Sequence, residues 1–281
     1  MILVTTAGKV GAHAARLLAA ERHAVRVLCR SAEKAASLRA AGAQAVVGDL
    51  AAPDSIDAAM RGVSGVILVS PAVASQELAV VDSAARAGVE HIVKVSSQNA
   101  PDSPIARRRG QARIEAGLLR SGIPATLLHS NAYMQNFLMT APQIAGTNTF
   151  DSATGEGRVG HVDARDVAAA AARIAGAPTA HRGRAYRPSG PAALSAREVA
   201  AVFSDVLSRP VVFRPVTADA QRRAMVDAGL PEQVAEDNAK ALGMMAEGDC
   251  DWVTGDVLTI LGRPPRSFAD FVADHADAFT R

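Results

Sequence analysis

The first half of the chain alternates between short apolar runs and longer alanine-rich stretches. The apolar runs are rich in β-branched residues and cover residues 2–5, 25–29, 45–48, 66–70, 92–96 and 126–129. Strands that are buried on both faces of a sheet read as continuous apolar runs. The intervening stretches have the period of helices and cover residues 11–21, 32–41, 55–61, 76–87 and 111–121. Because strands that alternate with crossover helices build parallel sheets, we predict a doubly wound α/β fold.

The pattern changes after residue 130. The elements expected from there on are a long loop at 131–160, a helix at 166–175, a short strand at 184–188, a helix at 196–207, a strand at 210–215, helical pieces within 218–247 and a final helix at 267–279. We therefore expect residues 1–130 to form one domain and residues 131–281 a smaller substrate-binding lobe. This lobe would pack on the carboxyl edge of the same sheet, where open α/β sheets bind ligands, and would not fold independently.

The composition restricts the class of partner. The chain has 281 residues, of which 49% are hydrophobic and 21% charged, and its net charge is +2. Such a small charge gives no reason to expect nucleic acid or an anionic membrane as a partner. We therefore expect a small-molecule ligand, and the pattern leaves the oligomeric state open.

Other features of the sequence are typical of a cytoplasmic protein. Cys29 and Cys250 lie far apart, as is usual in a reducing compartment. The first residues lack the charged and apolar regions of a signal peptide. No apolar run approaches the roughly 18–20 residues that cross a bilayer. No cluster of side chains has metal-ligand spacing, so we expect no metal.

The first predicted strand is followed by a turn that contains two glycines. Gly8 stands where backbone must approach a pyrophosphate, and Gly11 where the helix must pack close to its strand. The amino end of the helix would offer free N–H groups and a positive dipole to the phosphates. The turn therefore predicts a Rossmann-type dinucleotide site. The alternative is a tight turn without a ligand.

The second and third strands end at residues that bear on the choice of cofactor. Arg30 and Ser31 stand where an acid would bind an unmodified ribose and an arginine would pair with a 2′-phosphate. No acid is present there, which favours NADP(H) over NAD(H), unless Arg30 is only a solvated charge. Asp49 and Leu50 are placed to lie along the adenine, although Asp49 would also serve as a helix cap.

Taken together, these motifs resemble the NmrA-like family of atypical short-chain dehydrogenases/reductases over essentially the full chain. The matching segments are residues 7–11, 27–31, 47–50, 94–97, 115–128, 131–136, 161–168 and 190–195. The resemblance implies a Rossmann fold that binds NADP(H) or NAD(H). Family members include reductases of quinones and other small carbonyl compounds, and regulators that sense dinucleotides without turning them over.

The resemblance also implies roles for individual residues at the cofactor site. Those expected around the pyrophosphate are Thr5, Gly8, Lys9 and Val10. Those expected around the rest of the cofactor are Arg30 at the 2′-phosphate, Asp49 and Leu50 at the adenine, and Ser70, Pro71 and Ser96 at the nicotinamide half.

Three positions depart from the family pattern. Thr5 stands where the first glycine of the turn is usual, and a β-branched residue resists the positive φ that glycine supplies there. We therefore expect a reshaped turn. Gln111 replaces a lysine or histidine, and the sixth strand ends in His129 and Ser130 instead of Arg-Pro.

The Tyr-x-x-x-Lys pair of typical short-chain dehydrogenases is absent as well. The residues four positions after Tyr133 and Tyr186 are Phe137 and Gly190. A lysine is therefore not placed to lower the pKa of a tyrosine in the usual way.

A reduction would then draw its proton from another group. The candidates are His129, Tyr133, His161 and water, and we expect His129, at the carboxyl end of its strand, to be the acid unless it is only hydrogen-bonded there. The residues that would bind substrate are Asn131, Asn136, Gln111 and His161, with Tyr133 beside them. Asn131 and Asn136 would alternatively satisfy the backbone of their own loop.

These observations favour an NADPH-dependent reductase that acts on a small or polycyclic carbonyl or quinone. Gln111 and the missing Tyr-x-x-x-Lys pair leave open a non-catalytic regulator that senses NADP(H) or a metabolite. The altered turn at Thr5 leaves open an enzyme that no longer binds a dinucleotide and carries out an isomerisation or dehydration. The expected cofactor is accordingly NADP(H), or none under the last alternative.

Overall fold

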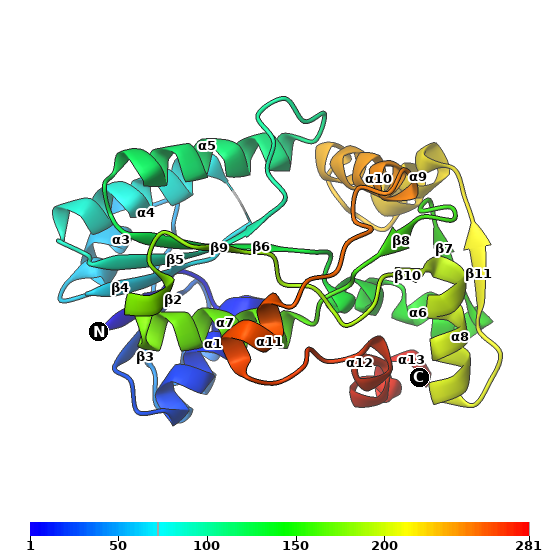
Figure 1. Ribbon diagram of the computed structural model, residues 1–281, viewed down its shortest axis with the longest axis horizontal. Helices are drawn as coiled ribbons and strands as arrows, with labels where there is room; N and C mark the ends of the chain where they lie inside the picture. The colour runs from blue at the N-terminus through cyan, green and yellow to red at the C-terminus, as the bar shows by residue number, and fades with distance from the viewer. Residues whose placement is uncertain (72, 281) are drawn as a thin grey trace.

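A parallel sheet runs through the centre of the protein (Figure 1). The computed structural model describes residues 1–71 and 73–280, and within them the strand order of this sheet is β3-β2-β1-β4-β5-β6-β9. Its strands are β1 (Ile2–Val4), β2 (Val25–Cys29), β3 (Gln44–Val47), β4 (Gly65–Leu68), β5 (His91–Ser97), β6 (Ala125–Ser130) and β9 (Ala185–Tyr186). The strand order reverses between β1 and β4, and such a reversal opens a ligand-binding crevice at the carboxyl ends of the strands.

Helices cover both faces of the sheet. One face carries α1 (Lys9–Ala20), α2 (Ala32–Ala40) and α7 (Ala164–Gly176), and the other carries α3 (Pro53–Met60), α4 (Ala74–Arg86) and α5 (Ala106–Arg120). Successive side chains of a strand point to opposite faces, so Val4 packs in the core under α1 and Leu3 in the core under α4. The predicted doubly wound α/β fold is confirmed.

The second half of the chain builds a lobe next to this sandwich and also joins it, through α7 and β9. The remaining elements are η1 (Met134–Met139), α6 (Ala141–Thr147), β7 (Thr149–Ser152), β8 (Arg158–Val159), η2 (Pro178–His181), β10 (Leu194–Ser195), α8 (Ala196–Leu207), β11 (Val212–Pro215), α9 (Ala218–Asp227), α10 (Glu232–Ala246), α11 (Asp256–Leu261), α12 (Phe268–Asp274) and α13 (Ala276–Thr280). An aromatic cluster fills the core between α8, β7, β11 and the last two helices, and its buried members are Phe150, Phe203, Phe213, Phe268, Phe271 and Phe279.

Two expectations for the second half are wrong. Residues 131–160 do not form a long loop, because η1, α6, β7 and β8 lie within them. Strand β7 is stabilised by a distant partner, since Phe150 stands opposite Phe213 of β11. The expected final helix is broken at His275 into α12 and α13.

Two buried aspartates fasten the C-terminal segment to the start of α7. Asp163 caps α7 by accepting a hydrogen bond from the Arg165 backbone N–H at 2.8 Å, and it pairs with the Arg165 side chain at 2.6 Å. The same guanidinium group pairs with Asp274 of α12 at 2.6 Å, so Asp163 acts on the C-terminal segment through Arg165. Asp166 pairs with Arg263 at 2.7 Å and accepts a hydrogen bond from the Arg266 N–H at 2.7 Å. A buried carboxylate without a partner is strongly destabilising, so these arginines fix the segment that leads into α12.

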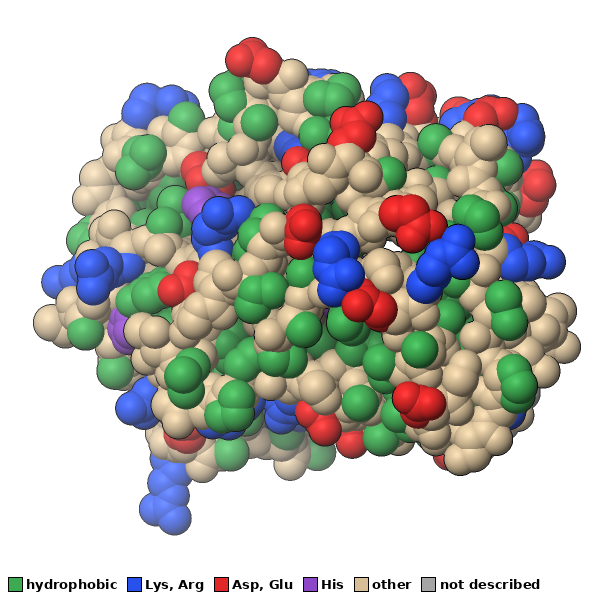
Figure 2. Space-filling view, turned by 45° about the vertical axis from the view of Figure 1, so that its right-hand side comes forward, with side chains coloured by type: hydrophobic (Ala, Val, Ile, Leu, Met, Phe, Trp, Pro, Cys, Tyr) green, Lys and Arg blue, Asp and Glu red, His purple; other side chains and the backbone are tan. Residues whose placement is uncertain are grey.

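The surface carries a mixture of charges. On the face drawn in Figure 2, acidic and basic side chains are interspersed, which agrees with the small net charge of +2. Among the helices of residues 1–71 and 73–280, none has both the length and the apolar character needed to cross a membrane.

Gly11 is the glycine that the fold itself requires in the first turn. A Cβ added at Gly11 would lie 1.9 Å from the carbonyl oxygen of Thr6. We expect Gly11→Ala to lower the free energy of unfolding by about 1–3 kcal/mol, the usual cost of overpacking. Urea denaturation measures the change, and Gly146→Ala, which adds a Cβ where no atom lies within 4 Å, is the control. Equal stability of the two variants would show that the turn yields without cost.

Candidate functional site

A cleft of about 1520 Å³ lies at the carboxyl edge of the sheet. The loops that follow β1, β2, β3, β4, β5 and β6 line it on one side, and residues of α9 and α10 on the other. All the residues predicted to hold the dinucleotide line this cleft: Thr5, Gly8, Lys9, Val10, Arg30, Asp49, Leu50, Ser70, Pro71 and Ser96.

The first turn solves the problem raised by Thr5 through side-chain hydrogen bonds. The hydroxyls of Thr5 and Thr6 donate to the carbonyl oxygen of Val69 at 2.8 and 2.9 Å, and the Val69 N–H donates to Thr5 Oγ1 at 2.9 Å. Thr5 is not among the described non-glycine residues with a positive φ. The turn is therefore tied to the end of β4, and the strained backbone expected at Thr5 is not required.

Gly8 has no structural need to be glycine. Its φ of −81° suits any residue, and an added Cβ would meet its nearest neighbour, Thr6 Oγ1, at an ordinary 3.8 Å. Gly8 provides no side-chain cap for α1, and the first turn of that helix holds no acidic residue. The open space above free N–H groups suits the close approach of an anion.

Three basic side chains line the same end of the cleft: Lys9, Arg30 and Lys34. Within residues 1–71 and 73–280 none of them forms an ion pair with a carboxylate. Lys9 stands at the positive end of the α1 dipole, a position that is unfavourable for a cation unless an anion is bound nearby. The residues present therefore fit the phosphates of a dinucleotide.

Lys34 was not identified from the sequence. It lies in the first turn of α2, and its backbone N–H donates to the N-capping hydroxyl of Ser31 at 3.1 Å. This cap holds Lys34 one turn away from Arg30. A basic residue three positions after a strand-end serine was the available signal. Asp49, for its part, accepts a hydrogen bond from the Ala51 N–H at 2.9 Å and so stabilises its own turn while lining the cleft.

The floor of the cleft next to β4 rests on a buried ion pair. Ser70 Oγ donates to Glu77 Oε1 at 2.6 Å, and Glu77 Oε2 lies 2.9 Å from Lys94 Nζ. The side chains of Glu77 and Lys94 are both 0% exposed. Burial lowers the pKa of Lys94, and the Glu77 carboxylate opposes this shift. The pair fixes the position of the Ser70 hydroxyl.

A second buried carboxylate lies next to β5. Glu115 Oε1 accepts a hydrogen bond from Ser96 Oγ at 2.5 Å and both carboxylate oxygens lie 3.0 Å from His129 Nε2. Asn99 also donates to Glu115. Burial alone would raise the pKa of Glu115, but the hydrogen bonds from His129, Ser96 and Asn99 outweigh it and lower this pKa. Gln111 Oε1 lies 3.2 Å from the Ser96 hydroxyl.

His129 itself does not line the cleft. The side chains of His129 and Ser96 both lie on the α5 side of the sheet, where both contact Glu115. Only Ser96, which is almost fully buried, is among the residues that line the cleft, while His129 is 21% exposed. We predicted that His129 would donate its proton directly to the substrate. In this geometry His129 is connected to the cleft through Glu115 and Ser96. Glu115, which links the two, was missed, although its spacing of four residues from Gln111 places both on one face of α5.

The other predicted proton donors line the cleft but are poorly prepared as acids. The Tyr133 hydroxyl lies 3.0 Å from Ser130 Oγ, which also donates to the Ser96 carbonyl oxygen at 3.0 Å. Burial raises the pKa of Tyr133. Burial also lowers the pKa of His161 to about 4, so its imidazole is neutral at pH 7.

The predicted substrate residues Asn131, Asn136, Gln111 and His161 all line the cleft. The Asn131 amide is taken up by its own surroundings, since Nδ2 donates to the carbonyl oxygens of Cys250 at 3.1 Å and Trp252 at 3.3 Å. Asn136 is exposed. The wall opposite is largely apolar, with Phe137, Leu194, Met225, Leu230, Leu242, Met245 and Trp252.

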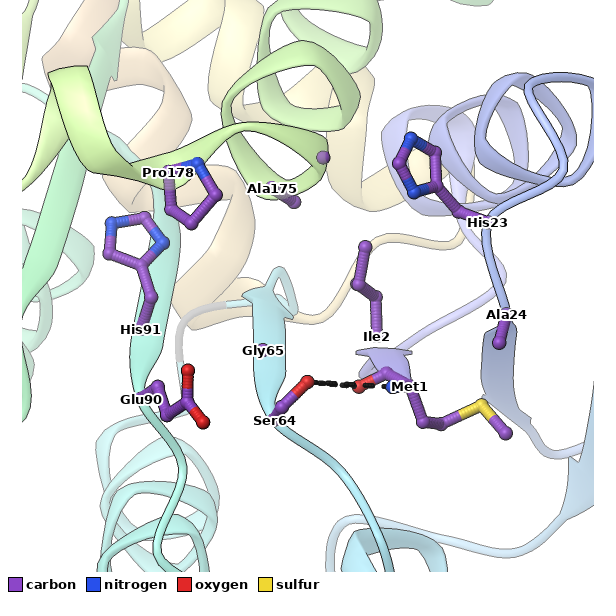
Figure 3. Close-up of a pocket in the computed structure, with 11 residues that line it drawn as sticks. Met1, Ile2, His23, Ala24, Ser64, Gly65, Glu90, His91, Ala175 and Pro178 are labelled. Atoms are coloured by element: carbon purple, nitrogen blue, oxygen red, sulfur yellow. Dashed lines mark hydrogen bonds between the residues drawn. The ribbon is translucent and has the colours of Figure 1, made fainter.

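A smaller hollow of about 270 Å³ lies at the amino edge of the sheet (Figure 3). His23, Glu90 and His91 surround it. His91 Nε2 is already hydrogen-bonded to Thr126 Oγ1 at 2.9 Å, and burial lowers its pKa to about 4. This hollow lies at the edge opposite to the one where open α/β sheets bind ligands, and its buried imidazole is occupied within the chain.

The part of the chain that the structure describes contains neither a cluster of metal ligands nor an exposed cysteine thiol. No group of three or more His, Cys, Asp or Glu side chains in residues 1–71 and 73–280 is placed to hold a metal ion. Cys29 and Cys250 are buried, and burial raises the pKa of both thiols, that of Cys250 to about 12.

Comparison with known proteins finds relatives that match nearly the whole chain. The chain is 35% identical over 99% of its length to an NAD(P)H azoreductase of Xenophilus azovorans, of which 99% is covered. It is 39% identical, with 99% of both chains covered, to a (4-alkanoyl-5-oxo-2,5-dihydrofuran-3-yl)methyl phosphate reductase of Streptomyces griseus. The crystal structure of an NADPH-dependent quinone oxidoreductase from Escherichia coli superposes with a TM-score of 0.86 at 27% identity, covering 98% of this chain and 99% of that one.

The sequence model of the NmrA-like family matches residues 1–272, which is nearly the whole chain. The chain therefore belongs to the NmrA-like family.

Proposed function

We propose that the protein is an NADPH-dependent reductase of planar, largely apolar carbonyl, quinone or azo compounds. The observation that carries this proposal is the phosphate end of the cleft, where Gly8 leaves an open cradle and Lys9, Arg30 and Lys34 have no carboxylate partner within residues 1–71 and 73–280. Gly8 and Lys9 would hold the pyrophosphate, and Arg30 and Lys34 the 2′-phosphate. Bound at this edge, the reduced nicotinamide would supply a hydride.

The relatives support both parts of the proposal. An azoreductase and a quinone oxidoreductase are among them, and one structure of the latter contains NADPH and superposes with a TM-score of 0.86 at 26% identity. The apolar wall formed by Phe137, Leu242 and Met245 suits a flat, uncharged substrate. In the same part of the cleft Arg108 is already paired with Asp249, which makes it a poor partner for an anionic group.

The two alternatives are less well supported. An enzyme without a dinucleotide was suggested by the strain expected at Thr5, but Thr5 has no positive φ. A non-catalytic sensor was suggested by the lack of a tyrosine–lysine pair. However, Ser96 is hydrogen-bonded to the buried Glu115, which pairs with His129, so groups able to exchange a proton are present next to the cleft. Turnover of a quinone by the purified protein with NADPH separates a reductase from a sensor.

Removal of the side chain of Arg30, which follows β2, or of Lys34, in the first turn of α2, should change the cofactor preference. We expect Arg30→Ala and Lys34→Ala each to raise the Kd for NADPH by about 10–100-fold, the loss of one charge-assisted contact. The Kd for NADH should change less than about threefold, because NADH has no 2′-phosphate. Calorimetric titration measures both constants, and Arg120→Ala, outside the cleft, is the matched control. An equal effect on both cofactors would remove these residues from the phosphate site.

Gly8→Ala should weaken the cofactor without unfolding the protein. The added Cβ meets no atom of the chain closer than 3.8 Å, but it enters the space proposed for the pyrophosphate. We expect the Kd for NADPH to rise at least about tenfold, or 1.4 kcal/mol. The control is the same NADPH titration of Gly146→Ala, which adds a Cβ in a helix outside the cleft. Unchanged affinity in Gly8→Ala would place the pyrophosphate elsewhere.

A further inference from the structure

Two serine hydroxyls at the floor of the cleft each donate a hydrogen bond to a buried glutamate, which in turn pairs with a basic side chain. Ser70 follows β4 and bonds to Glu77 of α4, which pairs with Lys94 of β5. Ser96 ends β5 and bonds to Glu115 of α5, which pairs with His129 of β6. The carboxylate partner in the first set is a lysine that is 0% exposed. In the second it is a titratable imidazole that is 21% exposed.

This difference in the cation decides what each set can do. Lys94 is sealed from solvent and also donates to the Val95 carbonyl oxygen at 2.6 Å, so its charge serves to hold Glu77. The His129 side chain is 21% exposed, and its Nε2 contacts the Glu115 carboxylate at 3.0 Å on the α5 side of the sheet. Imidazole exchanges protons near neutral pH, which an ammonium or guanidinium group does not do readily.

We infer that Ser96, Glu115 and His129 form a proton relay that carries one proton from solvent on the α5 side to the substrate in the cleft. The inference rests on the proposed reductase function. It is distinct from a direct role of His129, because His129 does not line the cleft. Ser96 is the member that would touch the substrate, and Glu115 and His129 act through it.

The strand register brings the three groups together. Ser96 and His129 are opposite each other on parallel neighbours β5 and β6, and side chains at the same level of two strands point to the same face. Glu115 lies above both on α5 and spans them, with 2.5 Å to Ser96 Oγ and 3.0 Å to His129 Nε2. No rearrangement of the backbone is needed to connect the cleft with solvent.

The proton balance closes over one turnover. A reduced nicotinamide, when bound, would supply a hydride to one end of a C=O or N=N bond, and the π electrons would move to the other end. That oxygen or nitrogen takes the Ser96 Oγ proton, while Ser96 takes a proton from the Glu115 carboxyl group. Glu115 has received this proton from the His129 imidazolium, and the neutral imidazole is reprotonated by solvent.

The Glu115 carboxylate has charged neighbours on β5 and β6. Glu115 faces His129 of β6, and the charge of Lys94 on β5 is close enough to interact with it. Lys94 is in turn balanced by Glu77 of α4. Asn99, which donates to the Glu115 carboxylate, is neutral, and so is Gln111, whose Oε1 accepts a hydrogen bond from Ser96.

The decisive variants keep the contact with Glu115 and remove the exchangeable proton. His129→Arg retains a permanent positive charge, and His129→Gln retains an N–H donor. With NADPH and methyl red as the azo substrate, we expect both to lower kcat by roughly 10²-fold, as for loss of a general acid. The loss should be smaller with 1,4-naphthoquinone, because a hydroquinone anion forms more readily than a nitrogen anion. His23→Gln, at the opposite edge of the sheet, is the matched control.

A second set of measurements separates the relay from the cofactor site. The Kd for NADPH should stay within about twofold of the parent in His129→Arg, since the relay residues are not the proposed phosphate ligands. In the cofactor-free protein, the infrared carboxylate band of Glu115 should titrate at higher pH in His129→Gln, because a positive partner that lowers its pKa is lost. Glu115→Gln identifies the band.

The outcomes distinguish the two levels of the account. Parental kcat and pH profile in His129→Arg, with a parent protein that binds NADPH and reduces the dye, would overturn the relay and leave the reductase intact. An unshifted Glu115 band in His129→Gln would also overturn it. A folded parent that binds no NADPH would overturn the proposed function, and the relay with it.

Discussion

Burial of carboxylates beneath the carboxyl edge of the sheet is the constraint on which the site depends. A buried carboxylate without a partner destabilises a protein strongly, so each one must be matched by a cation and by hydrogen bonds. Glu77 meets this requirement with Lys94 and Ser70, and Glu115 with His129 and Ser96. In each set the helix supplies the acid, while the serine and the cation come from consecutive strands. The two serines are thereby held in fixed orientations at the floor of the cleft.

The rest of the architecture positions a ligand above that floor. Asp166 directly, and Asp163 through Arg165, fasten the C-terminal segment to α7. The aromatic cluster around Phe203 gives the lobe its own core. The lobe thus closes over one half of the cleft with apolar side chains. The other half ends at the open cradle above Gly8, where the amino end of α1 and the basic side chains of Lys9, Arg30 and Lys34 suit an anion. One cleft therefore has a phosphate end and an apolar end.

The sequence was sufficient to predict the central sheet with its covering helices. It was not sufficient to predict the elements of the lobe or the buried groups around Glu77 and Glu115. Continuous apolar runs located β1 to β6 because these strands are covered on both faces. Residues 131–160 could not be predicted correctly, since β7 depends on Phe213 of a strand far along the chain. Thr5 was expected to strain the turn, but its hydroxyl finds Val69 instead, a contact that no local pattern encodes. Glu115 was missed because its role follows from the register of β5 and β6.

The proposed function depends on NADPH binding at the carboxyl edge, with its 2′-phosphate at Arg30 and Lys34. Calorimetric titration of the unaltered protein with NADPH and with NADH is the decisive experiment. We expect one NADPH to bind per chain, with a Kd at least about tenfold lower than that for NADH. Equal affinity for the two cofactors would remove the 2′-phosphate from Arg30 and Lys34, and a folded protein that bound neither cofactor would overturn the proposed function.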